Sequence, residues 1–440
     1  MTGQNGSTQS QRPSTRRDFL KHSAGAAALA GAASVNFSIS SQAAEINSET
    51  LKVGLIGCGG RGTGAASQAI NADKNVVLWA MGDAFDARLQ SSLSTLRQQA
   101  PEKIAVAPER QFSGLDAFQK VLSTDVDLVC LATPPGFRPQ HLRAAVEAGK
   151  HIFCEKPMAT DAPGLRSVME SAKLAKQKDL ALVAGFCWRY HYARRALYEK
   201  VHNGDLGDIR SIYATYYTGP VKPMPSDDKR QPGVSDLEWQ LRNWYNFVWL
   251  SGDSLVEQAI HSVDKIAWAM KDVPPLKAVA SGGRQLPNNS GNIYDHFNVQ
   301  YEYAGGVRAH LGSRQISGCH NENNDYVYGS KASGFIARGR VYTEGGESDW
   351  RYSGANNNMY QTEHDELFAS VRNGNPINDG EWMAKSTLMG LMGRMAAYTG
   401  KEVTWEEALN SQDQLVPDPM DWGMDLPIRP MALPGITKFA

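Results

Sequence analysis

Residues 51–83 decide the fold, and they begin with LKVGLIGCGGRG, from Leu51 to Gly62. The apolar run Leu51–Ile56 predicts a buried strand, and the segment after the glycines, residues 63–72, predicts a helix. A second apolar run ends at Asp83, about twenty residues beyond the third glycine. A G-x-G-x-x-G loop between a strand and a helix, followed by an acid at this spacing, is typical of dinucleotide binding.

Each residue of this loop has an expected role. Gly57 permits a tight turn, Gly59 lets a pyrophosphate approach the backbone, and Gly62 lets the helix pack closely on the strand. Free N–H groups at the start of the helix then face the phosphates, and Arg61 is expected to pair with the pyrophosphate. Asp83 should bind a ribose 2′-hydroxyl and repel a 2′-phosphate, so NAD is favoured, with NADP possible.

Composition limits the remaining classes of function. The chain has 440 residues, 42% hydrophobic and 21% charged, which is ordinary for a soluble protein of two domains. A net charge of −1 without a basic block makes nucleic acid an unexpected partner. The five cysteines show neither C-x-x-C nor Cys/His spacing, so we expect no metal site and no disulfide framework.

The N-terminus predicts a targeting segment. Residues 14–21, STRRDFLK, match the pattern of twin-arginine signals, and an alanine-rich stretch follows. Small residues ending at Ala44 form a plausible cleavage site. We therefore expect export through the twin-arginine translocase to the periplasm or beyond, a route by which cargo crosses the membrane already folded.

Strands and helices alternate beyond Asp83. The apolar runs 126–132, 151–154 and 180–185 predict strands separated by helices, which indicates a doubly wound parallel sheet. Ligands bind at the carboxyl ends of such strands. Period-two alternation after residue 296 predicts a second, mostly antiparallel sheet.

Four motifs together resemble the glucose–fructose oxidoreductase/inositol dehydrogenase (Gfo/Idh/MocA) family. They are the glycine loop, ATPP at 132–135, GKHIFCEKP at 149–157, and GF at 185–186 with RY at 189–190. The resemblance implies an N-terminal Rossmann domain, a C-terminal α+β domain with an open, mostly antiparallel sheet, and a homo-oligomer, dimer or tetramer. The predicted cofactor-binding residues are Gly57, Gly59, Gly60, Arg61, Gly62, Asp83, Thr133, Pro134, Pro135, His141, Glu155 and Lys156.

Two stretches are expected to carry the chemistry. Hydride removal from an alcohol needs a base for the hydroxyl proton, and Lys156 follows a strand at the ligand-binding edge. In SLVEQAIHSVDKIAW, residues 254–268, the spacing of Glu257, His261 and Asp264 puts them on one helix face. Taken alone, Glu257 and His261 could be a pair on the protein surface, but the resemblance implies that this helix lies against the nicotinamide. The predicted catalytic residues are Lys156, His261, Asp264 and Glu257, and either Lys156 or His261 could be the base.

The substrate side and the domain boundaries are predicted more coarsely. We expect a signal segment over residues 1–44, a Rossmann domain over 45–185, a substrate and oligomerisation domain over 186–411, and a tail over 412–440 that wraps over the body or a neighbouring subunit. Aromatic faces and fixed polar donors suit sugar rings. The predicted substrate-binding residues are Trp188, Arg189, Tyr190, Tyr217 and Arg242.

Location narrows the function, because outside the cytoplasm there is no NAD pool to exchange with. The leading hypothesis is an exported oxidoreductase acting on a sugar, polyol or glycoside hydroxyl with tightly held NAD(H). An alternative is redox-neutral glycoside cleavage by oxidation, elimination and reduction. An alternative of another class is a dinucleotide-holding sugar sensor without turnover.

Overall fold

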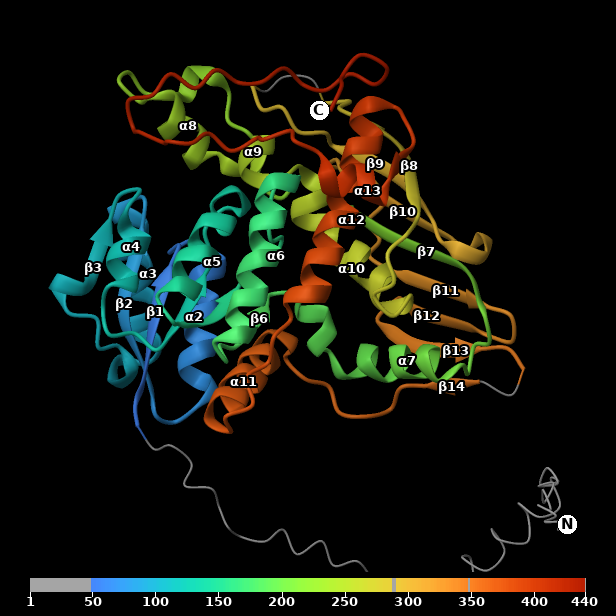
Figure 1. Ribbon diagram of the computed structural model, residues 1–440, viewed down its shortest axis with the longest axis horizontal. Helices are drawn as coiled ribbons and strands as arrows, with labels where there is room; N and C mark the ends of the chain where they lie inside the picture. Colours follow the sequence, from blue (N-terminus) through green and yellow to red (C-terminus); the bar gives the residue numbers. More distant parts are fainter. Residues whose placement is uncertain (1–48, 287–289, 347–348, 440) are drawn as a thin grey trace, which may run out of the picture. The chain divides into compact units, whose positions relative to one another are not determined.

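The computed structural model describes residues 49–286, 290–346 and 349–439. The predicted signal segment, residues 1–44, lies outside the described residues. Residues from Ser48 onward form one compact unit built on two sheets (Figure 1). In the described part of the chain, no helix is both long and apolar enough to cross a membrane.

The first sheet is the predicted parallel one. Its six strands lie in the order β3-β2-β1-β4-β5-β6, and every neighbouring pair is parallel. The strands are β1 (Leu51–Ile56), β2 (Val76–Asp83), β3 (Gln111–Ser113), β4 (Leu128–Leu131), β5 (His151–Cys154) and β6 (Leu182–Ala184). The helices between them are α2 (Gly60–Ala72), α3 (Asp86–Gln99), α4 (Ala117–Leu122), α5 (Arg138–Glu147) and α6 (Ala162–Gln177).

The apolar runs explain this half of the fold. β4 is buried along its whole length, as an apolar strand covered by helices on both faces should be. α6 begins where the Asp161 side chain accepts a hydrogen bond from the N–H of Gly164, a standard helix cap. The Rossmann prediction is confirmed.

The second sheet has nine strands in the order β14-β13-β12-β11-β7-β10-β9-β8-β15. Only the β7–β10 pair is parallel, so the predicted, mostly antiparallel sheet is confirmed for the described residues. Its strands are β7 (Ile209–Thr218), β8 (Lys277–Gly283), β9 (His296–Glu302), β10 (Arg308–Gln315), β11 (Asp325–Gly329), β12 (Ser333–Ala337), β13 (Arg340–Glu344), β14 (Trp350–Arg351) and β15 (Val403–Thr404).

Helices of the second half lie between the two sheets and around the second one (Figure 1). They are α7 (Tyr192–Asn203), α8 (Asp236–Arg242), α9 (Val248–Ser251), α10 (Ile260–Ala269), α11 (Met359–Arg372), α12 (Gly380–Thr399) and α13 (Trp405–Asn410). One π-helical turn, η7 (Leu255–Ala259), precedes α10. Buried side chains lie all around α12, because it packs against α6, α10 and β8.

The late helix α11 returns to the Rossmann half of the unit. It packs on α2, where Gln361 donates a hydrogen bond to the carbonyl of Gln68 and Arg372 pairs with Asp73. The strand β6 is extended by a bridge between Leu182 and Asn378. The sequence predicts a Rossmann domain ending at residue 185, and this later segment completes it.

Candidate active site

The glycine loop borders a cavity at the carboxyl ends of β1, β2 and β4. An added Cβ at Gly59 or Gly60 would meet nothing within 4 Å, so the backbone there faces open space. α2 starts at Gly60 without a side-chain cap or an acid in its first turn, which leaves its N–H groups for a ligand. At Gly62 a Cβ would lie 1.8 Å from the carbonyl oxygen of Gly57, so only glycine fits between helix and strand.

Asp83 lies at the edge of this cavity, as predicted. One carboxylate oxygen accepts a hydrogen bond from the N–H of Cys58 at 2.7 Å, and the other accepts one from the N–H of Phe85 at 2.9 Å. These two bonds fix the carboxylate between the glycine loop and the next turn. Each oxygen keeps lone-pair capacity for a hydroxyl group.

Arg61 borders the cavity, but its guanidinium is engaged elsewhere. It pairs with Glu155, donates to Gln68 at 2.8 Å and pairs with Glu363 at 2.9 Å. Burial alone would lower the pKa of Arg61, but the two carboxylates raise it overall. Buried acids from two distant segments thus bind this guanidinium, and the pairing of Arg61 with a pyrophosphate stays a prediction. Arg61 instead ties the glycine loop to the Glu155-Lys156-Pro157 triplet and to α11.

The remaining predicted cofactor residues divide between the cavity and its surroundings. Thr133, Pro134 and His141 border the cavity, whereas Pro135, Glu155 and Lys156 do not. The His141 ring contacts the Thr133 hydroxyl at 3.1 Å and stacks on Phe118. Burial and the nearby Arg138 lower the pKa of His141 to about 3, so this ring is a neutral part of the wall.

Lys156 and Glu257 form an ion pair between the two halves of the unit. The Lys156 ammonium lies 2.9 Å from a Glu257 carboxylate oxygen and also donates to the Glu257 carbonyl. The other Glu257 oxygen accepts from Gln258 at 2.7 Å, and Gln258 accepts from the Tyr216 hydroxyl at 2.9 Å. The π turn carries Glu257 and Gln258, and it brings both side chains to the lysine and to β7. The sequence did not indicate Gln258 or Tyr216.

His261 follows one turn later, on α10. Burial and the positive charges of Lys156, Lys265 and Arg61 lower the pKa of His261 well below its usual value, so its ring is neutral near pH 7. Its buried Nδ1 has no partner among the described residues. A neutral imidazole beside a lysine can accept a proton from a hydroxyl group that the lysine holds.

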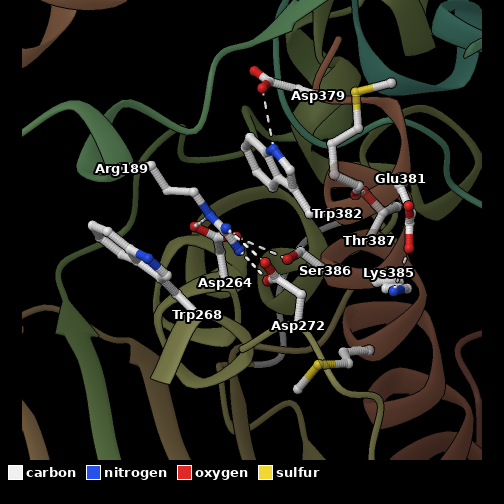
Figure 2. Close-up of polar contacts among 12 residues, drawn as sticks. Arg189, Asp264, Trp268, Asp272, Asp379, Glu381, Trp382, Lys385, Ser386 and Thr387 are labelled. Atoms are coloured by element: carbon white, nitrogen blue, oxygen red, sulfur yellow. Dashed lines mark hydrogen bonds and ion pairs between the residues drawn. The ribbon is translucent and has the colours of Figure 1, made fainter. Parts of the chain in front are cut away.

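Asp264 and Arg189 bind each other. Figure 2 shows the Arg189 guanidinium between Trp268 and Trp382, with Asp264 and Asp272 on it. The nearest Arg189–Asp264 contact is 2.8 Å, and Ser386 donates to the same carboxylate. Asp264 thus binds Arg189 and Ser386, and the catalytic role of Asp264 and the substrate role of Arg189 stay predictions. Burial without access to water requires such pairing, which sequence spacing alone does not reveal.

Three further residues that were predicted to bind substrate make contacts within the protein. The Tyr190 hydroxyl donates to the buried Asp379, so it lies in the core. Arg242 stacks on Phe85 at the cavity of the glycine loop, 4.3 Å from the ring centre. Tyr217 contacts Arg314 on the outer sheet face, because side chains alternate along β7, and the neighbouring Tyr216 points to Glu257 and Gln258. Period-two alternation from the buried Ile212 and Ala214 could have selected Tyr216.

Trp188 lies shortly after β6, in the short turn η4 (Cys187–Tyr190), and its role in substrate binding stays a prediction. That turn follows the carboxyl end of a parallel strand, the edge at which such sheets bind ligands. Among the described residues, no group of three or more His, Cys, Asp or Glu side chains is arranged to hold a metal. The site therefore consists of a dinucleotide cavity and a group made of Lys156, Glu257 and His261, and the two are connected through the pair of Glu155 with Arg61.

The cavity fits a dinucleotide in its glycine cradle, its uncapped helix start and its acid. Comparison with known proteins identifies the same cofactor. The family described as "Oxidoreductase family, NAD-binding Rossmann fold" matches residues 51–186, and the "GFO/IDH/MocA C-terminal domain" matches residues 194–334. The chain belongs to the Gfo/Idh/MocA family. It is an NAD-dependent oxidoreductase.

Individual relatives of this Gfo/Idh/MocA protein are distant. An inositol 2-dehydrogenase of Rhizobium meliloti is 25% identical over 350 residues, which cover 75% of this chain and 93% of that protein. A myo-inositol 2-dehydrogenase of Thermotoga maritima is 23% identical over 80% of this chain and 96% of that protein. The solved aldose-aldose oxidoreductase of Caulobacter crescentus shares the fold, with a TM-score of 0.64 and 20% identity over 81% of this chain and 100% of that one.

Proposed function

We propose that this protein is an exported oxidoreductase that acts on a hydroxyl group of a sugar, polyol or glycoside and keeps its nicotinamide cofactor between turnovers. The observation that carries the proposal is the Lys156–Glu257 pair, whose lysine helps to lower the pKa of the buried His261 and directly follows Glu155, the partner of Arg61 on the wall of the dinucleotide cavity. The inositol dehydrogenases among the relatives support the substrate class.

Each residue of this group has one task. Lys156 donates a hydrogen bond to the reacting hydroxyl oxygen and stabilises the negative charge that develops on it. His261 accepts the hydroxyl proton, because its lowered pKa keeps the ring neutral. Glu257 fixes the lysine by the contact at 2.9 Å, and Gln258 fixes Glu257 in turn. Bound NAD⁺ supplies the hydride acceptor.

A roof of two segments over the cavity supports cofactor retention. We define the roof as residues 236–246 together with residues 412–429 of the tail. Leu241 and Trp244 border the cavity directly. The tail carries Trp422, whose ring lies 5.6 Å from Phe85 on the cavity wall.

The two parts of the roof are bonded to each other. Gln240 donates to the carbonyl of Leu426 at 2.8 Å, and the N–H of Leu426 donates to Asp236 at 3.3 Å. Figure 1 shows the red tail running alongside α8 at the top of the view. A dinucleotide beneath both segments leaves only after they separate, which slows its release.

Retention fits export, since a cofactor loaded before translocation cannot be replaced from a periplasmic pool. The enzyme then returns its electrons to a second carbohydrate, in a ping-pong cycle. The twin-arginine pattern at residues 14–21 supports this location. The proposed partners are thus the twin-arginine translocase and a carbohydrate or polyol.

A homo-oligomer, dimer or tetramer, is also proposed. Aromatic rings form a row across the outer face of the second sheet, where Tyr213, Tyr326, Phe335 and Tyr342 follow one another at centroid distances of 5.8, 6.0 and 5.0 Å. Tyr213 is exposed and the other three rings are half-buried, and an apolar surface of this kind is typical of protein contacts. Light scattering tests this proposal: a Tyr326→Glu variant should be smaller than the parent, and a monomeric parent would refute it.

The function is tested on the cofactor-loaded protein. Polyols and aldoses are added in single-turnover amounts, and reduction of the bound cofactor is followed by its near-ultraviolet absorbance. His261→Ala should slow reduction by about 10²–10⁴-fold, the usual contribution of a general base. His310→Ala, on the second sheet, and Lys385→Ala, on the surface of α12, serve as matched controls. Reduction by no sugar or polyol, or full activity of both Lys156→Met and His261→Ala, would reject the proposal.

A further inference from the structure

A second group of charged side chains lies around Trp188, beyond His261 in the second half of the unit. We call it the Trp188 cluster, and it consists of Trp188, His191, Arg194, Lys265 and Asp325. Arg194 and His191 come from α7 and the residue before it, Lys265 from α10, and Asp325 from β11. Lys265 lies one helical turn from His261, and its charge contributes to the lowered pKa of that histidine. The cluster is therefore a neighbour of the proposed base.

The cluster holds more positive than negative charge. Lys265 is 1% exposed and pairs with Asp325 at 2.6 Å. Arg194 is 8% exposed, and its guanidinium lies 3.7 Å from the centre of the Trp188 ring. In the described part of the chain Arg194 has no carboxylate within 4.0 Å, because the nearby Asp325 is taken by Lys265. The cluster thus contains two buried cations, Arg194 and Lys265, and one carboxylate, which pairs with Lys265.

Polar atoms without partners gather at the same place. Nε of Arg194, Nδ1 of His191 and Oδ1 of Asp325 are buried and make no hydrogen bond among the described residues. Nδ1 of His261, one helical turn from Lys265, is also buried without a hydrogen-bond partner among the described residues. Buried polar groups are normally satisfied, so such a concentration indicates a site completed by a ligand. The Asp325 oxygen calls for a donor, such as a sugar hydroxyl group, and the Arg194 nitrogen calls for an acceptor. A buried, unpaired guanidinium is costly and calls for an anion.

Trp188 gives the cluster its place relative to the substrate. It follows β6 at the ligand-binding edge of the parallel sheet, where one side of its ring carries Arg194. Lys265 lies 5.5 Å from the centre of the same ring. An aromatic ring beside fixed donors suits a sugar ring that bears an anionic group.

We propose that the substrate carries a carboxylate, as hexuronates and aldonates do, and that Arg194 binds this group beside Trp188 while Lys265 supports it from α10. The inference rests on the proposed function. A carboxylate matches the single excess positive charge of the cluster. A phosphate monoester carries close to two negative charges at neutral pH and would leave one unmatched.

The test compares three probes on the cofactor-loaded protein: glucose, glucuronate and glucose 6-phosphate. Binding is measured as the shift in unfolding temperature, and turnover as the rate constant for reduction of the bound cofactor per unit of sugar concentration. Glucuronate should bind and react at least tenfold better than glucose and better than glucose 6-phosphate. Equal binding of glucose and glucuronate, or a preference for the phosphate, overturns the inference.

Two variants localise the effect. Arg194→Met should lower the ratio of glucuronate to glucose binding at least tenfold, and Arg194→Lys should restore part of it. Lys200→Met, which removes a more exposed positive charge from the same helix, is the control. If Arg194→Met does not fold, the Arg194→Lys variant and the three probes on the parent protein still test whether the cluster binds a carboxylate. If neutral sugars reduce the bound cofactor as well as glucuronate does, the inference is rejected and the proposed function is not. If glucuronate binds but does not reduce the cofactor, the proposed function is rejected.

Discussion

Replacing Gly59 by alanine should abolish cofactor binding and leave the fold intact. The Gly59 backbone has φ −71° and ψ −179°, which any residue can adopt. A Cβ there meets no protein atom within 4 Å, so the methyl group would project into the space in which a pyrophosphate approaches the loop. Gly62→Ala should instead destabilise the fold, because its Cβ would lie 1.8 Å from the Gly57 carbonyl oxygen.

The structure sets the size of both effects. Gly59 precedes the first residue of α2, and loss of a glycine at this position costs up to about 1 kcal/mol of stability. Displacing the phosphate from two N–H groups forfeits charge-assisted hydrogen bonds worth about 1.5–3 kcal/mol each, so NAD affinity should fall at least ~10²-fold. Gly62→Ala must move backbone by more than an ångström, which costs about 1–3 kcal/mol or more.

Urea unfolding of the cofactor-free proteins and calorimetric titration with NAD separate the two effects. Gly64→Ala is the matched control, since its Cβ would lie 3.5 Å from the Arg61 guanidinium, an ordinary contact within α2. That variant should gain about 0.5–1 kcal/mol from helix propensity and bind NAD as the parent does. Unchanged NAD affinity in Gly59→Ala would refute the assignment of this loop to the phosphates.

Three further predictions concern the walls of the site. Trp244→Ala should speed dissociation of bound NAD at least tenfold, as measured by dilution into a scavenging dehydrogenase, because this ring belongs to the roof; an unchanged rate would remove the roof from the account. Tyr216→Phe should slow cofactor reduction by releasing Gln258, whereas Tyr217→Phe on the outer face should not, and the reverse order would contradict the alternation found in β7. His141 has a pKa of about 3 in the folded protein and ~6.5 in the unfolded chain, so the unfolded state binds more protons below pH 6.5. The free energy of unfolding therefore falls as the pH drops below 6.5, by about 2 kcal/mol at pH 5. In urea titrations at several pH values, His141→Gln should remove this part of the pH dependence.

The Rossmann half could be predicted from the sequence because its signals are local. A strand, three glycines, a helix and Asp83 follow one another within one β-α-β unit, and steric limits at Gly62 make the pattern obligatory. The positions of Lys156, Glu257 and His261 were also predictable, since each follows a recognisable strand or helix pattern.

Long-range pairing explains what the sequence could not provide. The helix spacing that joined Asp264 to His261 is real, but Arg189 arrives from another segment and takes its carboxylate. Arg61 likewise forms an ion pair with Glu363, which lies about three hundred residues later in the chain. Such competition among buried charges depends on tertiary contacts, which no local spacing reports.

The tail was expected to wrap over the body or over a neighbouring subunit, and the structure places it over α8 and Phe85 of its own chain. No local pattern identifies the residues it meets. The link between tail and cofactor therefore became visible only in the folded chain.

The most direct test is to purify the protein, denature it, and identify and quantify any released dinucleotide by mass spectrometry. The account predicts close to one NAD or NADH per chain, and a shift between the two forms when the intact protein first meets a carbohydrate substrate. Protein that carries no dinucleotide and rebinds added NAD only weakly would contradict a retained cofactor and the chemistry built on it.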